Sequence, residues 1–369
     1  MGKTPAVSDE TALKRIQTGS FNDDMHRLHD CDWICEAVIE KLGVKRDVLG
    51  KANAHRKPGS IISTNTSGIP LRDIYRDMPQ SLCADVAVTH FFNPVHIMKL
   101  VELVPGDQTR PEVVPKLADF LGNTLGKGVV YAKDTVNFIG NRIGCMWINA
   151  GLNIAENAVT REGLSIETVD ALLGEPIGLP DTGLFGLVDL VGLDIVENVN
   201  RNLDANLPPD DRARNFLDLP GEVAEMLKRQ QLGRKTGGGF YRLNRHADGS
   251  KSMDVYDLVG GTWRNLQPVN NSEHQSIAEF FQSDTAQSMM VRRIMTETLA
   301  YAATCVPAIA DDIVNVDRAM RWGFAWEQGP FELMDTIGPI NLVHALEAFN
   351  IPSPPLIQTM LESSEQRFY

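Results

Sequence analysis

Polar side chains that could perform acid–base chemistry cluster in a short part of the sequence. His90 ends one apolar run, and Glu102 lies twelve residues later in another. A histidine bound by a carboxylate is suited to act as a general base, because the carboxylate fixes the tautomer and raises the basicity of the other ring nitrogen. Ser67 follows a third apolar run, and Asn141 lies in the first helix of the next segment. Their hydroxyl and amide groups could bind a polar substrate beside such a base.

Each of these residues also has an ordinary structural explanation. A histidine at a strand end is more often a satisfied structural residue, and serine or asparagine after a strand is usually a turn former or a helix cap. His90 and His96 could be considered as a metal pair, but they are six residues apart with no Cys or Asp nearby. We therefore expect no metal site.

The elements that would position these residues alternate between strand and helix. Apolar runs predict five strands, at 32–38, 60–64, 86–92, 99–104 and 127–133. Helical spacing is found at 43–55, 71–78 and 111–125. Strands that alternate with helices indicate an α/β domain with a largely parallel sheet. Ligands collect at the carboxyl ends of parallel strands, where the sequence places His90 and Ser67.

The chain divides into segments with different patterns. From Phe138 onward apolar residues recur every three or four positions, which is typical of helices. The predicted segments are a partial Rossmann-like nucleotide-binding domain, a helical domain, a hairpin with a linker, and a second copy of the helical unit, at 1–135, 136–245, 246–276 and 277–369.

The second copy is predicted from a repeated motif. Gly, Phe, Leu, Asp and Gly recur with identical spacing in 183–192 and in 329–338, 146 residues apart. Val169-Asp170 and Val316-Asp317 also correspond, with the offset slipped by one residue. We interpret the two stretches as related all-α units that pack on each other.

Composition excludes several classes of protein. The chain has 369 residues, with 35 basic and 48 acidic side chains and a net charge of −13. Such a charge argues against binding of nucleic acid or anionic membranes through the overall field. No apolar run approaches the length needed to cross a membrane, so no membrane insertion is expected. The five cysteines are scattered and odd in number, which predicts reduced, buried thiols in a cytoplasmic protein.

Taken together, four groups of residues resemble the 3-hydroxyacyl-CoA dehydrogenase family. In chain order they are Asn65-Thr66-Ser67, His90-Phe91-Phe92-Asn93-Pro94 with Met98–Glu102, Lys133-Asp134-Thr135 with Asn141-Arg142, and Lys235-Thr236-Gly237-Gly238-Gly239-Phe240-Tyr241. The chain looks like the dehydrogenase part of bacterial bifunctional enzymes that also carry an enoyl-CoA hydratase. This resemblance implies a Rossmann-like domain followed by helical units, NAD as cofactor, and oxidation of 3-hydroxyacyl-CoA to 3-ketoacyl-CoA in fatty-acid β-oxidation.

The resemblance also implies a role for each matched residue. His90 would take the proton of the 3-hydroxyl as hydride leaves for the nicotinamide, and Glu102 would orient His90. Ser67 and Asn141 would bind the reacting oxygen or the thioester. The residues that match cofactor contacts are Glu40, Lys45, Asn65, Asn93 and Lys235.

The family's glycine-rich turn is missing from the sequence. The family's nucleotide-binding domain begins with a Gly-x-Gly-x-x-Gly turn that holds the pyrophosphate, and no such motif occurs here. We therefore expect an N-terminally truncated member that lacks its first βαβ unit. Two functions stay open: a dehydrogenase, or an incompetent fragment that binds acyl-CoA or another subunit. A homo-oligomer and association with separate N-terminal or hydratase portions are also open.

Overall fold

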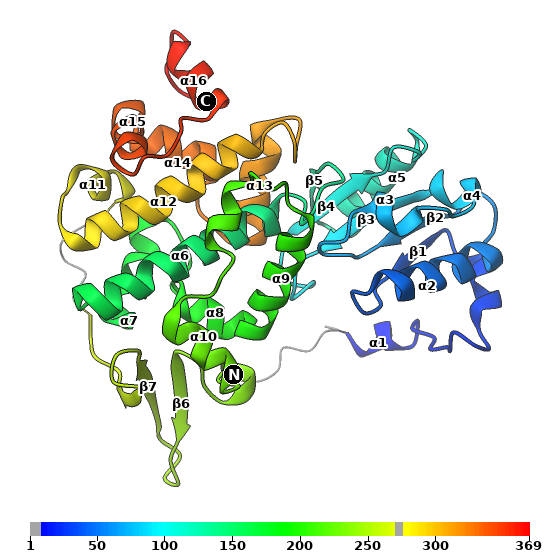
Figure 1. Cartoon of the computed structure of the whole chain (residues 1–369). Coiled ribbons are helices and arrows are strands. Elements are labelled where there is room, and N and C mark those ends of the chain that lie inside the picture. Colours follow the sequence, from blue (N-terminus) through cyan, green and yellow to red (C-terminus); the bar gives the residue numbers. More distant parts are fainter. Residues whose placement is uncertain (1–8, 270–275) are drawn as a thin grey trace. The chain divides into compact units, whose positions relative to one another are not determined.

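The computed structural model describes residues 9–269 and 276–369, which fall into two compact units. The first unit ends at Phe138 and the second begins at Ile139 (Figure 1). In the described ranges no helix is both long enough and apolar enough to span a bilayer.

A five-stranded sheet forms the centre of the first unit. Its strands are β1 (Trp33–Glu36), β2 (Ile61–Thr64), β3 (Val86–Phe91), β4 (Leu100–Pro105) and β5 (Gly128–Tyr131), in that spatial order. The pairs β1–β2, β2–β3 and β4–β5 are parallel, whereas β3–β4 is antiparallel. The sheet is therefore mixed, as the short β3–β4 connection requires: a parallel crossover needs a dozen or more residues.

Helices on the two sides of this sheet complete the first unit. They are α1 (Glu10–Leu13), the 3-10 turn η1 (Met25–Asp30), α2 (Leu42–His55), α3 (Leu71–Tyr75), α4 (Gln80–Cys83), and α5 (Val113–Asp119), which continues into the π-helical turn η2 (Phe120–Thr124). Val113, Leu117 and Leu121 share a core with Ala87 and Val101 of the sheet. Apolar burial on one stripe of α5 and η2 thus fixes this helix against β3 and β4.

The exposure of Cys35 contradicts one prediction. We expected buried cysteines, but Cys35 in β1 is exposed. In the described sheet β1 pairs with β2 alone, so part of its surface faces solvent. All five cysteines are free thiols.

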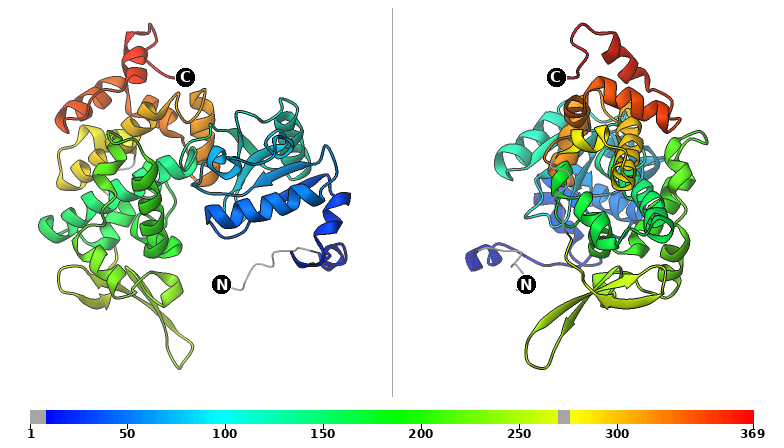
Figure 2. Two further views of the ribbon diagram at one scale, coloured as in Figure 1. Left: turned by 45° about the vertical axis from the view of Figure 1, so that its right-hand side comes forward. Right: turned by 90° about the vertical axis from the view of Figure 1, so that its left-hand side faces the viewer.

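The second unit is mainly helical and contains a small sheet. Its elements up to the sheet are α6 (Gly140–Glu162), α7 (Ile166–Leu172), η3 (Glu175–Ile177), α8 (Phe185–Val191), α9 (Leu193–Asn206), η4 (Arg212–Phe216), α10 (Gly221–Lys228) and η5 (Arg234–Thr236). After the sheet come α11 (Ile277–Gln282), α12 (Ala286–Cys305), α13 (Ile313–Gly323), α14 (Pro330–Ile337), α15 (Pro339–Ala348) and α16 (Pro355–Glu362). We expected a hairpin and linker at 246–276, whereas the structure has a three-stranded antiparallel sheet that begins earlier and projects from these helices (Figure 2). Its strands are β6 (Tyr241–Arg245), β7 (Lys251–Asp257) and β8 (Thr262–Asn265).

Two buried aspartates organise the first helical copy. Asp170 accepts hydrogen bonds from the Phe185 backbone N–H at 2.6 Å and from the Tyr241 hydroxyl at 2.8 Å. Asp189 accepts from the backbone N–H groups of Phe240 and Tyr241 at 2.8 and 2.7 Å. The rings of Phe185 and Phe240 pack with their centres 4.5 Å apart. A Phe-Tyr pair is thus held against α7 and α8.

The second copy repeats these contacts. Asp317 accepts from the Phe331 N–H at 2.8 Å and from the Tyr369 hydroxyl at 2.7 Å. Asp335 accepts from the N–H groups of Phe368 and Tyr369 at 2.8 and 2.9 Å, and the rings of Phe331 and Phe368 lie 4.9 Å apart. The repeated sequence therefore corresponds to a repeated set of hydrogen bonds.

Candidate active site

The antiparallel pairing of β3 with β4 brings His90 opposite Glu102. The His90 Nδ1 atom lies 2.6 Å from Glu102 Oε2. His90 is only 4% exposed and Glu102 is fully buried. With Nδ1–H donating to the carboxylate, Nε2 is the nitrogen that can accept a proton. The pair therefore has the arrangement of an oriented general base.

Aromatic rings fix the plane of the His90 imidazole. The Phe92 ring lies 4.7 Å and the Phe138 ring 5.8 Å from it, centre to centre. These rings limit rotation of the imidazole and shield its bond to Glu102 from water. A bond in such surroundings is electrostatically stronger than one in water.

Glu40 holds the turn that carries Ser67. One Glu40 carboxylate oxygen accepts hydrogen bonds from the backbone N–H groups of Ser67 and Gly68 at 3.0 and 3.2 Å. Burial opposes ionisation of Glu40, but the Thr66 hydroxyl and the Lys45 ammonium outweigh it and lower the pKa of this carboxyl. Glu40 is therefore an anion that organises the turn after β2.

Lys45 of α2 forms a buried ion-pair network that includes Glu40. Its Nζ atom is 3.1 Å from a Glu40 oxygen and 3.1 Å from a Glu36 oxygen. Glu36 also accepts a 2.6 Å hydrogen bond from the Thr64 hydroxyl. Glu36 was not among the residues predicted from the sequence. The signal that could have revealed it is an acidic residue in an apolar strand run, because a buried charge needs a partner.

Asn65 joins the ends of β2 and β3. Its side-chain oxygen accepts a 2.9 Å hydrogen bond from the Phe91 N–H, two residues before Asn93. Over the described residues the Asn65 NH₂ group donates no hydrogen bond, so it is available to bind a ligand. Asn93 is exposed just beyond the end of β3. Both amides thus lie at the strand ends that also carry His90.

The remaining predicted site residues belong to the second unit. Asn141 lies half-buried in the first turn of α6. Lys235 is exposed in η5 and forms an ion pair with Asp194 of α9. The structure therefore brings together His90 with Glu102, and Ser67 with Glu40 and Lys45, whereas Asn141 and Lys235 are positioned within the other unit. Over the described residues, no group of three His, Cys, Asp or Glu side chains could hold a metal ion.

Comparison with known proteins assigns the chain to a family. Residues 2–135 match the model for the NAD-binding domain of 3-hydroxyacyl-CoA dehydrogenase, and residues 138–243 match the model for its C-terminal domain. A protein of Deinococcus radiodurans named "Probable 3-hydroxyacyl-CoA dehydrogenase" is 35% identical over 240 residues, which is 65% of this chain and 67% of that protein. The chain belongs to the 3-hydroxyacyl-CoA dehydrogenase family.

Longer relatives match almost the whole chain. A Bacillus subtilis protein, also named "Probable 3-hydroxyacyl-CoA dehydrogenase", is 35% identical over 361 residues, or 96% of this chain and 45% of that protein. The alpha subunit of the fatty acid oxidation complex from Shewanella putrefaciens is 27% identical and covers 94% of this chain and 44% of its own length. The chain thus spans about half the length of these relatives.

Solved structures share the fold. The (S)-3-hydroxybutyryl-CoA dehydrogenase of Ralstonia eutropha is 29% identical, with a TM-score of 0.53 over 62% of this chain and 75% of that one. The 3-hydroxybutyryl-CoA dehydrogenase of Escherichia coli aligns over 93% of this chain and 81% of its own, with a TM-score of 0.67 at 22% identity. The Rossmann-like sheet followed by helices is confirmed.

The first unit presents groups that fit part of NAD. The ionised Glu40 can accept bonds from ribose hydroxyls, and the amides of Asn65 and Asn93 can bind polar groups of the nicotinamide half. These groups lie at the carboxyl ends of β1, β2 and β3, where such sheets bind ligands. A Gly-x-Gly-x-x-Gly turn for the pyrophosphate does not occur in the sequence.

Proposed function

We propose that this chain carries the catalytic groups for NAD-dependent oxidation of a 3-hydroxyacyl-CoA to a 3-ketoacyl-CoA in fatty-acid oxidation. The observation that carries the proposal is the buried 2.6 Å contact between His90 Nδ1 and Glu102 Oε2. Family membership and the matched NAD-binding domain support the reaction class. A dehydrogenase of an alcohol needs a base for the hydroxyl proton, and this pair can supply it.

The proposed reaction divides between the protein and its cofactor. NAD, when bound, supplies the acceptor for the hydride that leaves C3 of the substrate. His90 accepts the hydroxyl proton at Nε2 as the C3–O bond gains double-bond character. Glu102 keeps Nδ1 protonated and stabilises the imidazolium that forms. Ser67 and Asn141 bind the reacting oxygen or the thioester.

The proposal also assigns cofactor contacts, which the family resemblance implies. Glu40, Asn65 and Asn93 contact the ribose and nicotinamide side of NAD. Lys45 is fully buried, so it acts mainly through Glu40, which it holds by an ion pair. Lys235 is proposed as a further cofactor contact.

The proposal includes location and partners. Five free cysteines are compatible with the cytoplasm, where we place the protein. The substrate is an acyl-CoA, and we propose that the chain forms a homo-oligomer or associates with the portions that its longer relatives carry. The alternative function is a module that binds acyl-CoA or another subunit without turnover.

One experiment separates the two functions. The full chain is mixed with NAD⁺ and 3-hydroxybutyryl-CoA, and NADH formation is followed by absorbance. Calorimetry measures the binding of NADH and of 3-hydroxybutyryl-CoA. We expect NADH formation that His90→Gln abolishes and His96→Gln retains, since His96 is exposed and lies outside the paired residues of β3 and β4. Acyl-CoA binding without NADH formation would instead establish the binding module.

A further inference from the structure

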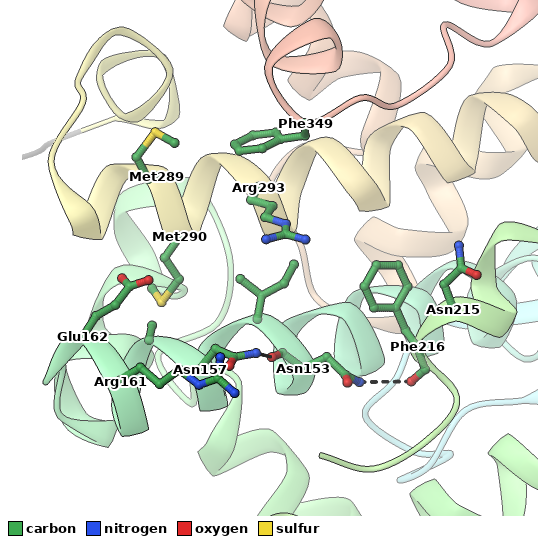
Figure 3. Close-up of a pocket in the computed structure, with 12 residues that line it drawn as sticks. Asn153, Asn157, Arg161, Glu162, Asn215, Phe216, Met289, Met290, Arg293 and Phe349 are labelled. Carbon is green, nitrogen blue, oxygen red and sulfur yellow. Dashed lines mark hydrogen bonds between the residues drawn. The ribbon is translucent and has the colours of Figure 1, made fainter. Parts of the chain in front are cut away.

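A cavity of about 560 Å³ lies in the second unit, between α6 and α12 (Figure 3). It lies near the carboxyl end of α6, where Asn157 lines it. Asn141 is sixteen residues earlier on the same helix, which corresponds to about 24 Å. The volume is within the range of small-ligand sites, roughly 300–1,000 Å³. The cavity is therefore separate from the substrate contact proposed at Asn141.

Two arginines from different helices line this cavity. Arg161 comes from the last turn of α6, and Arg293 extends from α12 toward α6 (Figure 3). Within the described ranges neither guanidinium has an ion-pair partner. The carboxylate one turn beyond Arg293, Glu297, is occupied by Arg212, with contacts of 2.6 and 2.8 Å.

The local charge is opposite to that of the whole chain. Glu162 is the single acidic side chain of the lining, against two arginines. The chain as a whole carries a net charge of −13. A positively charged cavity on such a chain attracts anions that most of its surface repels.

The rest of the lining combines apolar side chains with three amides, those of Asn153, Asn157 and Asn215. Met289 and Met290 line it from α12, Phe216 from η4, and Phe349 from the end of α15. Methionine fits irregular apolar ligands because its chain is unbranched and its sulfur polarisable. Aromatic rings add flat apolar surface. The cavity thus joins cationic and amide groups to apolar side chains.

The opposite end of the same helix pair is filled. There Arg142 of α6 meets Tyr301 of α12 through a hydrogen bond and contacts Asp211 at 2.5 Å. The Tyr301 hydroxyl donates to Asp211 at 3.0 Å. The start of α6 therefore packs on the end of α12 with all three polar groups paired. At the other end of the helix pair, Met289 and Arg293 line the cavity instead of filling the space between the helices. The cavity is therefore confined to this end of the helix pair.

We infer that this cavity binds an anionic amphiphile: a carboxylate or phosphate group held by Arg161 and Arg293, with an alkyl chain against Met289, Met290, Phe216 and Phe349. Guanidinium groups bind both anions through charge-assisted hydrogen bonds. The inference does not rest on the proposed dehydrogenase activity, because no residue assigned to that reaction lines the cavity.

Calorimetric titration of the full chain tests this binding. The probes are octanoate and octyl phosphate, which share an alkyl chain and differ in the anionic group, and octyltrimethylammonium, which reverses the charge. We expect saturable binding of at least one anion and none of the cation, and the tighter anion identifies the preferred head group. Absence of saturable binding of both anions, or equal binding of the cation, would overturn the inference.

Variants show whether binding occurs at this cavity. Arg161→Gln and Arg293→Gln are each expected to weaken binding about tenfold, as a lost charged hydrogen bond does. Asn157→Trp fills the cavity from α6 and should abolish binding. Arg201→Gln, an exposed arginine of α9, is the matched control and should leave the affinity unchanged. Circular dichroism melting verifies that each variant folds. Undiminished binding by folded Arg161→Gln and Arg293→Gln variants would contradict the assignment.

Discussion

At the scale of single residues, the His90–Glu102 pair depends on strand direction. The sequence placed both residues in neighbouring strands, and the resemblance implied that they act together. His90 lies near the end of β3, and Glu102 lies nearer the start of β4. A parallel pairing would align the starts of the two strands and separate these residues. The antiparallel register pairs His90 with Glu102 directly. The chemistry was thus predictable from residue types, whereas the geometry depended on a connection too short for a parallel crossover.

The dyad gives the first residue-scale prediction. Glu102→Gln keeps the size of the side chain but removes the charge that stabilises protonated His90. We expect kcat to fall by about 10²–10⁴, in line with the contribution of general-base catalysis. Calorimetric NADH binding should stay unchanged, which separates catalysis from folding. The control Glu112→Gln alters a surface ion pair and should retain full activity. A kcat within about threefold of the unmodified chain in Glu102→Gln would show that the pair is not catalytic.

The buried lysine gives a second prediction at this scale. Lys45→Met leaves the Glu36 carboxylate buried without its cation, and removing one partner of such a pair costs about 3–5 kcal/mol. Urea unfolding should show a loss of this order. The double variant Glu36→Gln with Lys45→Met removes both charges and should recover part of the stability. A double variant as unstable as Lys45→Met alone would mean that Glu36 is not the group left unpaired.

At the scale of elements, the repeat was only partly visible in the sequence. The motifs at 183–192 and 329–338 could be matched in the sequence because each encloses one short helix, α8 or α14, at the same spacing. The Phe-Tyr pairs could not be matched in this way. Phe240 follows Asp189 by 51 residues, whereas Phe368 follows Asp335 by 33. Periodicity reveals contacts at fixed separation, so a contact across connections of different length could not be found this way.

These Phe-Tyr pairs give a prediction for the two copies. Tyr241→Phe and Tyr369→Phe each remove the hydroxyl that donates to a buried aspartate, Asp170 or Asp317. Because both aspartates are buried, each change should lower the free energy of unfolding by roughly 1–3 kcal/mol. Urea unfolding measures both variants. Tyr301→Phe, with an unrelated set of partners, indicates how far any loss is specific to the repeated contact. A loss below about 0.5 kcal/mol in both would refute the structural role.

The same aspartates make stability depend on pH. Burial raises the pKa of Asp170 to about 7 and that of Asp317 to about 7, although hydrogen bonds from tyrosine and backbone groups favour ionisation. In the unfolded chain these groups titrate near pH 4. The folded chain therefore binds more protons between about pH 4 and pH 7, and the free energy of unfolding falls as pH rises through that window. Urea midpoints should decrease from pH 5 to pH 7.5. The double variant Asp170→Asn with Asp317→Asn should flatten this slope; an unchanged slope would assign it to other groups.

At the scale of the whole second unit, the two helical copies share one core. Trp147 of α6 packs edge-on against Trp326, with ring centres 6.2 Å apart. Gly144 lies so close to the Phe324 ring that a Cβ atom there would come within 2.0 Å of it. Arg142 reaches Tyr301 and Asp211. Trp326, Phe324 and Tyr301 belong to the second copy, whereas Asp211 belongs to the first. Part of the packing of α6 therefore depends on residues beyond 277.

Deletion of 277–369 tests this dependence. The deletion uncovers the face of α6 that includes Trp147, and it leaves Arg142 without Tyr301 while Asp211 stays in place. Each large apolar side chain returned to water costs about 1.5–3 kcal/mol, and monomers rarely expose a patch of this kind. We expect the 1–276 fragment to dimerise or precipitate, because a second copy of the fragment offers the same apolar face in place of the missing one. Light scattering after size-exclusion chromatography measures the mass, and hydrogen exchange reports on α6.

The full chain is the control. If the fragment is a soluble monomer with α6 amides as protected as in the full chain, the two copies are independent folding units. The identical Phe-Tyr contacts would then stabilise each copy separately.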